Sequence, residues 1–355
     1  MKSIESAPIG GYNGNGDVIM VTINDIAQKM GLSTATISNA LSGKGRVSEA
    51  KRRQIIDVAS EMGYDFNRIR SILPRRTIAV FVETLSIIFC TRITEAICRS
   101  AEAAGFHVNL YNLDILYPEG DINPPRERVR EKLAQIVAQL DPTTMGAIYV
   151  SQYPRDVTGI MPPLPCPVAY AYCYANDGAP SVNTDDQQGA YTAVRHLLDL
   201  GKKRIAMVSG PINSIPMTKR FSGYQRALID AGMSVDLRLV KLGDWDIGRS
   251  CEMMAELLRG DPRPDGVFCQ SDHIALGVCQ AIRRADLTIP GDIAVVGFDN
   301  YDFAALVSPA LTSIAQPLEE IGRTAFRQIL AIIEKQSLES RNILLNARLV
   351  IRRSA

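Results

Sequence analysis

The chain contains 355 residues, of which 46% are hydrophobic and 22% are charged, and its formal net charge is +1. This composition is typical of a globular protein with several domains and excludes a wholly disordered chain. The charge is uneven, because residues 21–76 carry ten Lys and Arg against five Asp and Glu, whereas residues 77–355 are mildly acidic.

Residues 1–20 are rich in Gly, Asn and Ser and contain no long apolar run. We therefore expect a disordered tail here, and neither a secretory signal nor a membrane span. The seven cysteines are odd in number and lie mostly in apolar surroundings, which favours buried thiols in a reducing compartment over a disulfide framework. These features predict a cytoplasmic protein that does not contact the membrane.

The segment Thr22–Leu41 predicts two short helices joined by a tight turn. Thr22 and Asp25 have the spacing of a capping box, Gly31 is free to adopt a positive φ, and Ser33 can cap the second helix. This is the pattern of a helix-turn-helix, whose second helix enters the major groove of DNA, although an ordinary helical corner would fit it too. The short side chains that we expect to face outward from the second helix are Thr34, Ala35, Thr36, Ser38 and Asn39.

A third helix is predicted from a Ser48 cap to Met62, after a basic loop that contains Arg46. A small basic region on a mildly acidic body is typical of a protein that binds nucleic-acid phosphates. We therefore favour a DNA-binding function for residues 21–66 over the ordinary helical corner.

Residues 22–67 resemble the headpiece of the LacI/GalR family of bacterial transcriptional repressors. The matching residues are the run from Thr22 to Ser38, the pair Val47-Ser48, and the segment Gly63–Asn67. The resemblance implies a homodimer that binds a near-palindromic, double-stranded DNA operator. We expect Thr34, Ala35 and Asn39 to face base edges. Where the family often has a guanine-reading Arg, we expect Asn39 to favour adenine or to show no preference. The residues expected at phosphates are Thr22, Ser33, Thr36, Ser38, Arg46 and Ser48.

Residues 67–76 form the predicted hinge between the headpiece and the rest of the chain. In the resembled family this segment becomes helical on DNA, and an apolar wedge, here Leu73, enters the minor groove. Asn67 matches the family pattern, but Arg70 replaces a small residue and Pro74 disfavours helix at Leu73. Arg70 could enter a narrow minor groove, and a plain basic linker remains an alternative.

From Thr77 onward, short apolar strands alternate with amphipathic helices, which predicts parallel sheets covered by helices on both faces. The expected strands are Ile78–Val82, His107–Tyr111, Ala147–Val150, Val168–Tyr172, Arg204–Ser209, Leu239–Leu242, Gly266–Cys269 and Ile293–Phe298. The expected helices are Ile93–Ala104, Arg126–Leu140, Gln187–Leu200, Gly223–Ala231, Arg249–Leu258, Ile274–Ala285 and Ile321–Ile333.

The family resemblance continues through this body, and the matching segments are Gly201–Ala206, Arg220–Tyr224, Ser271–Gly277, Ile289–Asn300 and Leu311–Pro317. It implies a small all-α helix-turn-helix headpiece followed by an α/β, two-lobed, periplasmic-binding-protein-like effector domain with two parallel, doubly wound sheets. We expect the first lobe to contain about residues 77–183 and 318–338, and the second lobe about residues 184–317 and 339–355.

The cleft between the lobes is the expected site for a small-molecule effector, which the resemblance indicates is a carbohydrate or a related metabolite. Arg220, in a loop before a helix, and Asp299, at a strand end, could each form paired hydrogen bonds with ligand hydroxyl groups. A structural Arg–Asp ion pair is the alternative. Ser271 replaces a family Asn, Asp272 could instead only cap a helix, and Trp245 could stack on a sugar or simply pack. The full expected set is Glu83, Ser86, Phe89, Tyr172, Arg220, Trp245, Ser271, Asp272 and Asp299.

An enzyme and a free-standing sugar-binding receptor are the rival classes of function. The three histidines lie on separate predicted elements, and no HExxH, paired CxxC, GxSxG or Walker motif occurs. Cys269 and His273 are four residues apart but lack two further ligands. We therefore expect no catalytic site, no metal and no cofactor.

Overall fold

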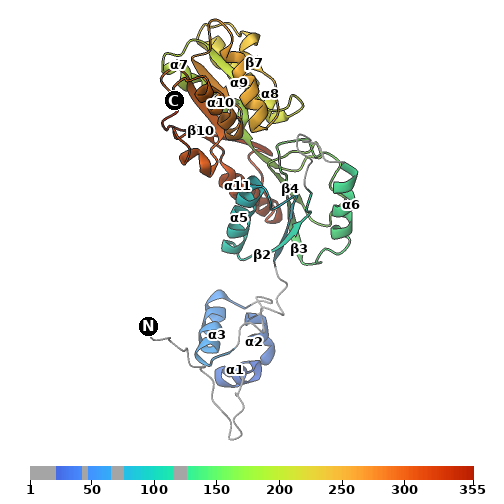
Figure 1. The fold of residues 1–355 in the computed structure, drawn as a ribbon. Helices are drawn as coiled ribbons and strands as arrows, with labels where there is room; N and C mark the ends of the chain where they lie inside the picture. Colours follow the sequence, from blue (N-terminus) through green and yellow to red (C-terminus); the bar gives the residue numbers. More distant parts are fainter. Residues whose placement is uncertain (1–20, 42–46, 65–75, 116–125) are drawn as a thin grey trace, which may run out of the picture. The chain divides into compact units, whose positions relative to one another are not determined.

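The computed structural model describes residues 21–41, 47–64, 76–115 and 126–355, and the chain divides into two compact units, residues 1–76 and 77–355 (Figure 1). The two units are described separately. The expected disordered tail and four residues expected to contact DNA, Arg46, Asn67, Arg70 and Leu73, lie outside the described residues.

In the smaller unit, the described residues form three helices, α1 (Ile23–Met30), α2 (Thr34–Leu41) and α3 (Glu49–Glu61). The capping box predicted at Thr22 and Asp25 is present, and Gly31 ends α1 with a φ of 62°. Only three residues separate α1 from α2, which is the helix-turn-helix connection expected from the sequence. The three helices share one apolar core built from Ile26, Ala27, Ile37, Ala40, Leu41, Ile55, Ala59 and Tyr64.

The larger unit contains two six-stranded sheets, each belonging to one lobe. The strand order is β11-β5-β4-β3-β1-β2 in the first lobe and β12-β10-β9-β8-β6-β7 in the second. All the pairings are parallel except β12 with β10. The strands are β1 (Thr77–Val82), β2 (His107–Asn112), β3 (Thr144–Val150), β4 (Val168–Ala171), β5 (Ser181–Asp185), β6 (Ile205–Val208), β7 (Val240–Lys241), β8 (Gly266–Cys269), β9 (Ala294–Asp299), β10 (Thr312–Ala315), β11 (Asn342–Asn346) and β12 (Arg348–Val350).

Helices cover both faces of each sheet, as the alternating pattern predicts (Figure 1). In the first lobe α5 and α11 pack on one face and α6 on the other; in the second lobe α9 and α10 cover one face, and α7 and α8 the opposite one. These helices are α5 (Ile88–Ala103), α6 (Arg126–Val137), α7 (Asp186–Asp199), α8 (Ile215–Asp230), α9 (Ile247–Leu258), α10 (Asp272–Arg284) and α11 (Leu318–Ile333), with short 3-10 turns η1 (Leu237–Leu239) and η2 (Asp302–Ala305).

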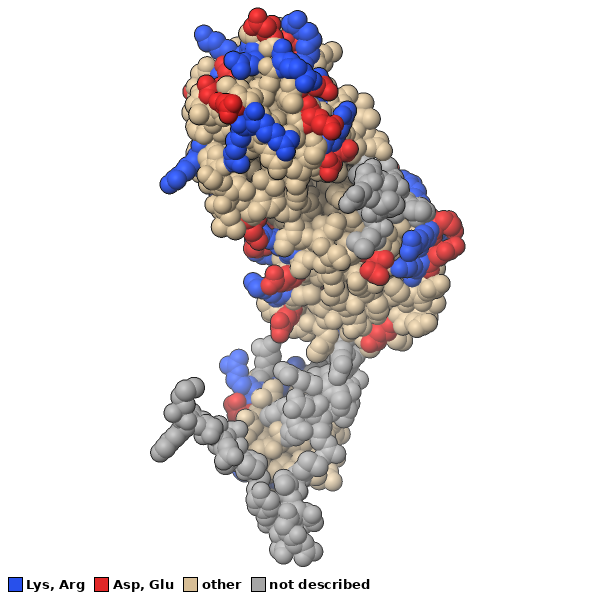
Figure 2. Space-filling view, in the orientation of Figure 1, with Lys and Arg blue, Asp and Glu red and all other residues tan. Residues whose placement is uncertain are grey.

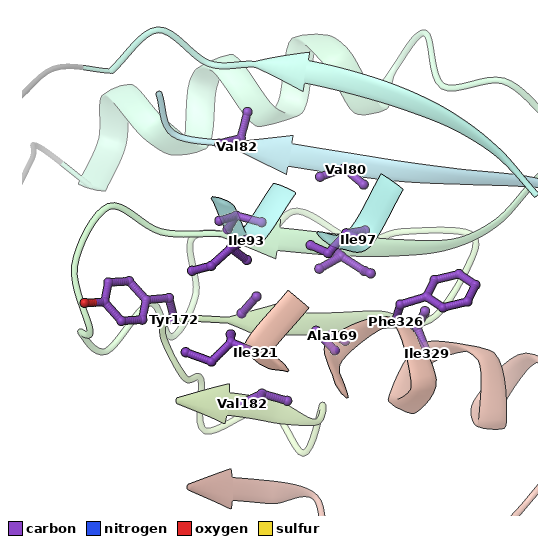
Figure 3. Close-up of a cluster of buried hydrophobic side chains, with 14 of the residues drawn as sticks. Val80, Val82, Ile93, Ile97, Ala169, Tyr172, Val182, Ile321, Phe326 and Ile329 are labelled. Carbon is purple, nitrogen blue, oxygen red and sulfur yellow. The ribbon is translucent and has the colours of Figure 1, made fainter. Parts of the chain in front are cut away.

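The apolar core of the first lobe ends at the cleft side of its sheet. Val80, Ile97 and Ile329 pack between the sheet and its helices, and Tyr172 lies at the end of this row, just beyond β4 (Figure 3). The Tyr172 ring therefore belongs to the same buried cluster that holds the helices on the sheet.

The predicted lobe boundary near residue 339 is wrong. β11 pairs with β5 in the first sheet, whereas β12 pairs with β10 in the second, so the last crossing lies at Ala347. The sequence does not reveal this, because strands β11 and β12 are short and are separated by one residue.

Two element boundaries change the placement of expected site residues. α8 begins at Ile215, so Arg220 lies on the helix and not in a loop before it. α5 begins at Ile88, so Phe89 belongs to its first turn and not to the preceding loop. Pro216 at the start of α8 explains the first difference, because proline is favoured in the first turn of a helix although it breaks a helix interior.

Among the described residues, no helix is both long enough and apolar enough to cross a bilayer. On the visible face of the two-lobed unit, Lys and Arg are interspersed with Asp and Glu, with no large area of one sign (Figure 2).

Candidate functional site

The outward face of α2 consists of short side chains, as predicted. Thr34, Ala35, Ser38 and Asn39 are exposed, and Thr36 is half-buried. Ile37, Ala40 and Leu41 on the opposite face enter the core of the headpiece. α2 can therefore approach a flat or grooved surface closely and contact it through hydroxyl and amide groups.

The capping hydroxyls of the headpiece are engaged at helix starts. Thr22 Oγ1 donates to the Asp25 carboxylate over 2.7 Å, and the amide of Thr36 donates to Ser33 Oγ over 3.1 Å. Ser48 Oγ accepts from the amide of Lys51. The three capping residues Thr22, Ser33 and Ser48 are exposed, so three helix N-termini lie at the surface, where backbone N–H groups suit anions such as phosphates.

A cavity of about 260 Å³ lies between the two lobes of the larger unit. Six of the nine residues that we expected to bind the effector line it: Phe89, Tyr172, Arg220, Trp245, Ser271 and Asp299. The other lining residues are Tyr153, Pro154, Pro216, His273 and Tyr301.

Arg220 is the cationic group of this cavity, and only 3% of its side chain is exposed. Its Nε donates to Asp186 Oδ1 over 2.8 Å, its Nη1 donates to the carbonyl of Gln270, and its Nη2 lies 3.4 Å from Asp299 Oδ1. The guanidinium also lies over the Phe298 ring, 3.7 Å from its centre. Burial acts to lower the pKa of Arg220, but the two carboxylates raise it, so the side chain stays charged.

Asp299 ends β9 with a φ of 97°, which places its carboxylate beside Arg220 at the end of the strand. Gln316 Nε2 donates to Asp299 Oδ1 over 2.7 Å. The structural ion pair, which we set as the alternative to a ligand contact, is therefore present, and both of its residues also line the cavity.

Ring side chains form the rest of the wall. The Phe89 ring lies 5.9 Å from the Tyr172 ring and 5.3 Å from the Tyr301 ring, at interplanar angles of 49° and 50°. Tyr172 has a φ of 61°, and its hydroxyl donates to Gln316 Oε1 over 2.9 Å. Trp245 packs so closely on Gly210 that any side chain there would collide with the indole.

Asp272 does not line the cavity, contrary to our expectation. Its carboxylate accepts from the Ser313 hydroxyl over 2.6 Å and from the amide of Tyr301 over 2.8 Å, and the side chain is buried. Ser271, not Asp272, caps α10 by accepting from the amide of His273. Burial and the nearby Asp299 raise the pKa of Asp272 to about 8. Asp272 therefore holds the η2 segment against α10 and β10.

Glu83 is also turned away from the cavity. Its carboxylate is fully buried and accepts hydrogen bonds from Tyr149, Ser151 and the amide of Gln152, and it forms an ion pair with Arg155. Ser86 lines a different cavity, of about 430 Å³, between α5 and the segment around η2. A carboxylate directly after a strand looks like a ligand contact in the sequence, but here it is a partner for a buried arginine.

The sequence did not single out the cavity residues Tyr153, His273 and Tyr301. Tyr153 and Tyr301 each follow a β-strand by a few residues, and His273 opens α10, so their position at carboxyl ends of strands was the available signal. Burial lowers the pKa of His273, with Asp299 opposing it, and raises the pKa of Tyr153 and Tyr301. All three rings are therefore uncharged at neutral pH.

Two family models match the chain. Residues 22–67 match bacterial regulatory proteins of the lacI family, and residues 194–355 match a periplasmic binding protein-like domain. The repressor CytR of Escherichia coli K12 is 31% identical over 347 residues, which span 94% of this chain and 96% of that protein. Catabolite control protein A of Priestia megaterium is 29% identical over 340 residues, spanning 94% of this chain and 99% of that protein.

Solved structures show the same fold. A transcriptional regulator CelR–cellobiose complex is 25% identical, with a TM-score of 0.63, and the match covers 94% of this chain and all of that one. The lac repressor dimer bound to operator and an anti-inducer is 24% identical, with a TM-score of 0.68, over 95% of this chain and 99% of that one.

A helix-turn-helix unit joined to a two-lobed domain with an inter-lobe cavity defines the class of ligand-responsive transcriptional regulators. The similarity to CytR extends over nearly the whole length of both proteins. The chain belongs to the LacI family of bacterial regulatory proteins and is a DNA-binding transcriptional regulator.

Proposed function

We propose that this protein is a dimeric repressor whose affinity for a near-palindromic operator is controlled by a small hydroxylated molecule, a carbohydrate or related metabolite, bound between the lobes. One observation carries the proposal: a single chain combines an exposed face of α2 with a cavity that holds Arg220 beside Asp299. This face of α2, called the reading face below, consists of Thr34, Ala35, Ser38 and Asn39. A duplex reader alone needs no such cavity, and a sugar receptor alone needs no such helix.

The reading face supports the DNA part of the proposal. Thr34, Ala35 and Asn39 are exposed near the start and along one side of α2, where a recognition helix contacts base edges. Two copies related by a twofold axis would present two such helices to successive major grooves. The operator is then expected to consist of two inverted half-sites.

The cavity supports the control part. Lining residues come from both lobes, so a bound molecule contacts both and favours one angle between them. Control of DNA binding requires that the ligand bind the DNA-bound and free forms with different affinity. We place this activity in the cytoplasm, where the operator is, and assign the chain no catalytic role, because its relatives CytR and catabolite control protein A are regulators.

The test begins with selection of duplexes by the purified full-length protein, followed by affinity measurements on the recovered site. Ala35→Glu places a carboxylate on the reading face and should abolish retention of the operator. Ser60→Glu adds the same charge at an exposed position in the last turn of α3 and should have little effect. Failure of the wild-type protein to retain any duplex in dilute buffer would leave only the receptor, the second candidate.

The control step is tested with a thermal-shift screen of sugars, nucleosides and sugar phosphates. A compound that stabilises the protein in this screen should change the affinity for the operator. Asp299→Asn should weaken binding of that compound, while the operator affinity measured without the compound stays unchanged. Light scattering should give the mass of two chains. Steady chemical turnover of the compound by pure protein would instead support an enzyme.

A further inference from the structure

Ring side chains dominate the inter-lobe cavity. Among the described residues, eleven line it, and six of these carry unsaturated rings: Phe89, Tyr153, Tyr172, Trp245, His273 and Tyr301. A sugar usually needs many hydrogen-bonding side chains, because each buried hydroxyl without a partner weakens binding. Among the described lining residues, only Arg220, Ser271 and Asp299 have a polar side chain without a ring.

Most polar groups in the wall are already engaged. Each of the three guanidinium nitrogens of Arg220 has a partner. The Tyr172 hydroxyl donates to Gln316, and Ser271 Oγ accepts from a backbone amide. Trp245 Nε1 has no hydrogen-bond partner among the described residues, but the atom is buried, so Trp245 contributes its ring to the wall. The wall therefore offers wide π faces and a few polar contacts.

The charges in the wall disfavour an anion. Arg220 is the only Lys or Arg among the described lining residues, and it already faces Asp186 and Asp299, both buried. A phosphate or carboxylate would compete with these two carboxylates for one guanidinium and would be repelled by Asp299.

We infer that the effector is an uncharged molecule that joins a hydroxylated ring to a planar unsaturated ring. Its hydroxyl groups bind Arg220 and Asp299, and its planar ring packs on the aromatic wall. Nucleosides and aryl glycosides share this chemistry. The inference rests on the proposed function of the cavity and narrows the ligand class.

The test uses the full-length protein and two matched sets of probes. One set is uridine, cytidine and adenosine against ribose and uridine 5′-monophosphate; the other is phenyl β-glucoside against glucose and glucose 6-phosphate. Trp245 is the only tryptophan of the chain, so its emission reports occupation of the cavity. We expect a ring-bearing neutral probe to bind about tenfold or more tightly than its parent sugar, as stacking on aromatic side chains predicts. The phosphorylated member should bind more weakly than the neutral one.

The possible outcomes distinguish the two kinds of ligand, and they test the inference separately from the proposed function. Binding confined to one set assigns the ligand to nucleosides or to aryl glycosides. The inference is overturned if a parent sugar or a phosphorylated probe binds as tightly as the ring-bearing neutral probe, or if no ring-bearing probe binds at millimolar concentration. A probe that binds without changing operator affinity leaves the inference intact and contradicts the proposed function instead.

Two variants test the roles of the ring wall and of the charge separately. Phe89→Leu keeps the fluorescence reporter and should weaken binding of the ring-bearing probe several-fold more than binding of the parent sugar. Tyr191→Leu removes a half-buried ring of α7 outside the cavity and should change neither. Asp299→Asn retains a residue type that tolerates a positive φ and should narrow the preference for neutral over phosphorylated probes. An unchanged preference in Asp299→Asn would show that charge does not select the ligand.

Discussion

Arg220 is bonded on two sides by carboxylates that have almost no access to water. Asp186 comes from the first turn of α7 and Asp299 from the end of β9, so one guanidinium joins two elements of the second lobe. The same side chain borders the cavity. Its substitution therefore affects both the fold and ligand binding, and the two effects must be measured separately.

We expect Arg220→Ala to lower the free energy of unfolding by about 3–5 kcal/mol, because it leaves two buried carboxylates without their cation. Urea unfolding, followed through Trp245 emission, measures this change. Asp299→Asn should cost much less, because Asp186 still pairs with Arg220. Equal stability of Arg220→Ala and wild type would mean that the two carboxylates are neutral in the folded protein.

Asp272 makes stability depend on pH. Burial raises its pKa from the ordinary value of 3.8 to about 8. The folded chain therefore keeps a proton that the unfolded chain releases, so the contribution of this group is complete below pH 3.8, declines as pH rises, and is lost above about pH 8.

Asp272→Asn cannot titrate, so its free energy of unfolding should fall less than that of wild type across this pH window. Urea unfolding of both proteins at several pH values inside the window measures the difference. Parallel pH profiles would show that Asp272 is ionised in the folded protein throughout, held so by Ser313 and the amide of Tyr301.

Asn39 lies exposed on the outward face of α2. An amide suits adenine and a guanidinium suits guanine, and each bidentate pair discriminates by about 1–3 kcal/mol. Selection from random duplexes with Asn39→Arg should therefore recover guanine at one symmetric position where wild type recovers adenine or no preference. An invariant guanine in the wild-type site that depends on residue 39 would contradict this.

At the scale of elements, three pairs of helices meet at a glycine. Gly223 of α8 faces α7, Gly277 of α10 faces α9, and Gly322 of α11 faces α5. A β-carbon at any of these positions would lie between 2.1 and 2.4 Å from a backbone oxygen of the partner helix. The helix pairs that cover the two sheets thus depend on backbone contact that only glycine permits.

We expect Gly277→Ala to lower the free energy of unfolding by about 1–3 kcal/mol, although alanine is the better helix former, because α9 and α10 must separate. Gly248→Ala is the matched control: it lies in the exposed first turn of α9, where the added carbon meets only the Asp246 side chain. Thermal unfolding of both variants tests the pair. A stabilised Gly277→Ala protein would refute the close contact.

At the scale of the whole two-lobed unit, Gln316 joins the lobes beside the cavity. Its Nε2 donates to Asp299 of the second lobe over 2.7 Å, and its Oε1 accepts from Tyr172 and Thr184 of the first lobe, each over 2.9 Å. The residue lies where the chain passes from β10 to α11, at one of the crossings between lobes. A change in the angle between the lobes must alter these bonds.

Gln316→Leu should therefore reduce the effect of ligand binding on operator affinity. It should weaken ligand binding alone and operator binding alone much less. The coupling free energy, typically ~1–3 kcal/mol in such proteins, should fall towards zero. Operator affinity with and without saturating ligand measures it. Gln328→Leu removes an equally buried glutamine from α11 that bonds only within the first lobe, to the carbonyl of Ser340, and should retain the coupling. If Gln316→Leu kept the full coupling free energy, the hydrogen bonds of Gln316 would not link ligand binding to operator binding.

The fold of the headpiece could be predicted most completely from the sequence, because the residues that determine its helices and turn lie close together in the chain. The cap at Thr22, the turn at Gly31 and the alternation of Ile37 and Ala40 with exposed polar residues all act within a few positions of one another. The α/β class of the body was readable for the same reason, because apolar strands and amphipathic helices differ in period. The last crossing at Ala347 could not be predicted, because β11 and β12 choose partners that are not their neighbours in the chain: β11 pairs with β5 and β12 with β10.

The site shows the same division between local and tertiary information. From the sequence alone, the residue types at Arg220, Trp245 and Asp299 pointed to a ligand, and the tertiary structure brings them to one cavity. Only the tertiary structure turned Glu83 towards Arg155 and Asp272 towards Ser313, and added Tyr153, His273 and Tyr301 to the wall. The physical reason is that a buried charge binds whichever partner the packing supplies, and such partners come from elements distant in the chain.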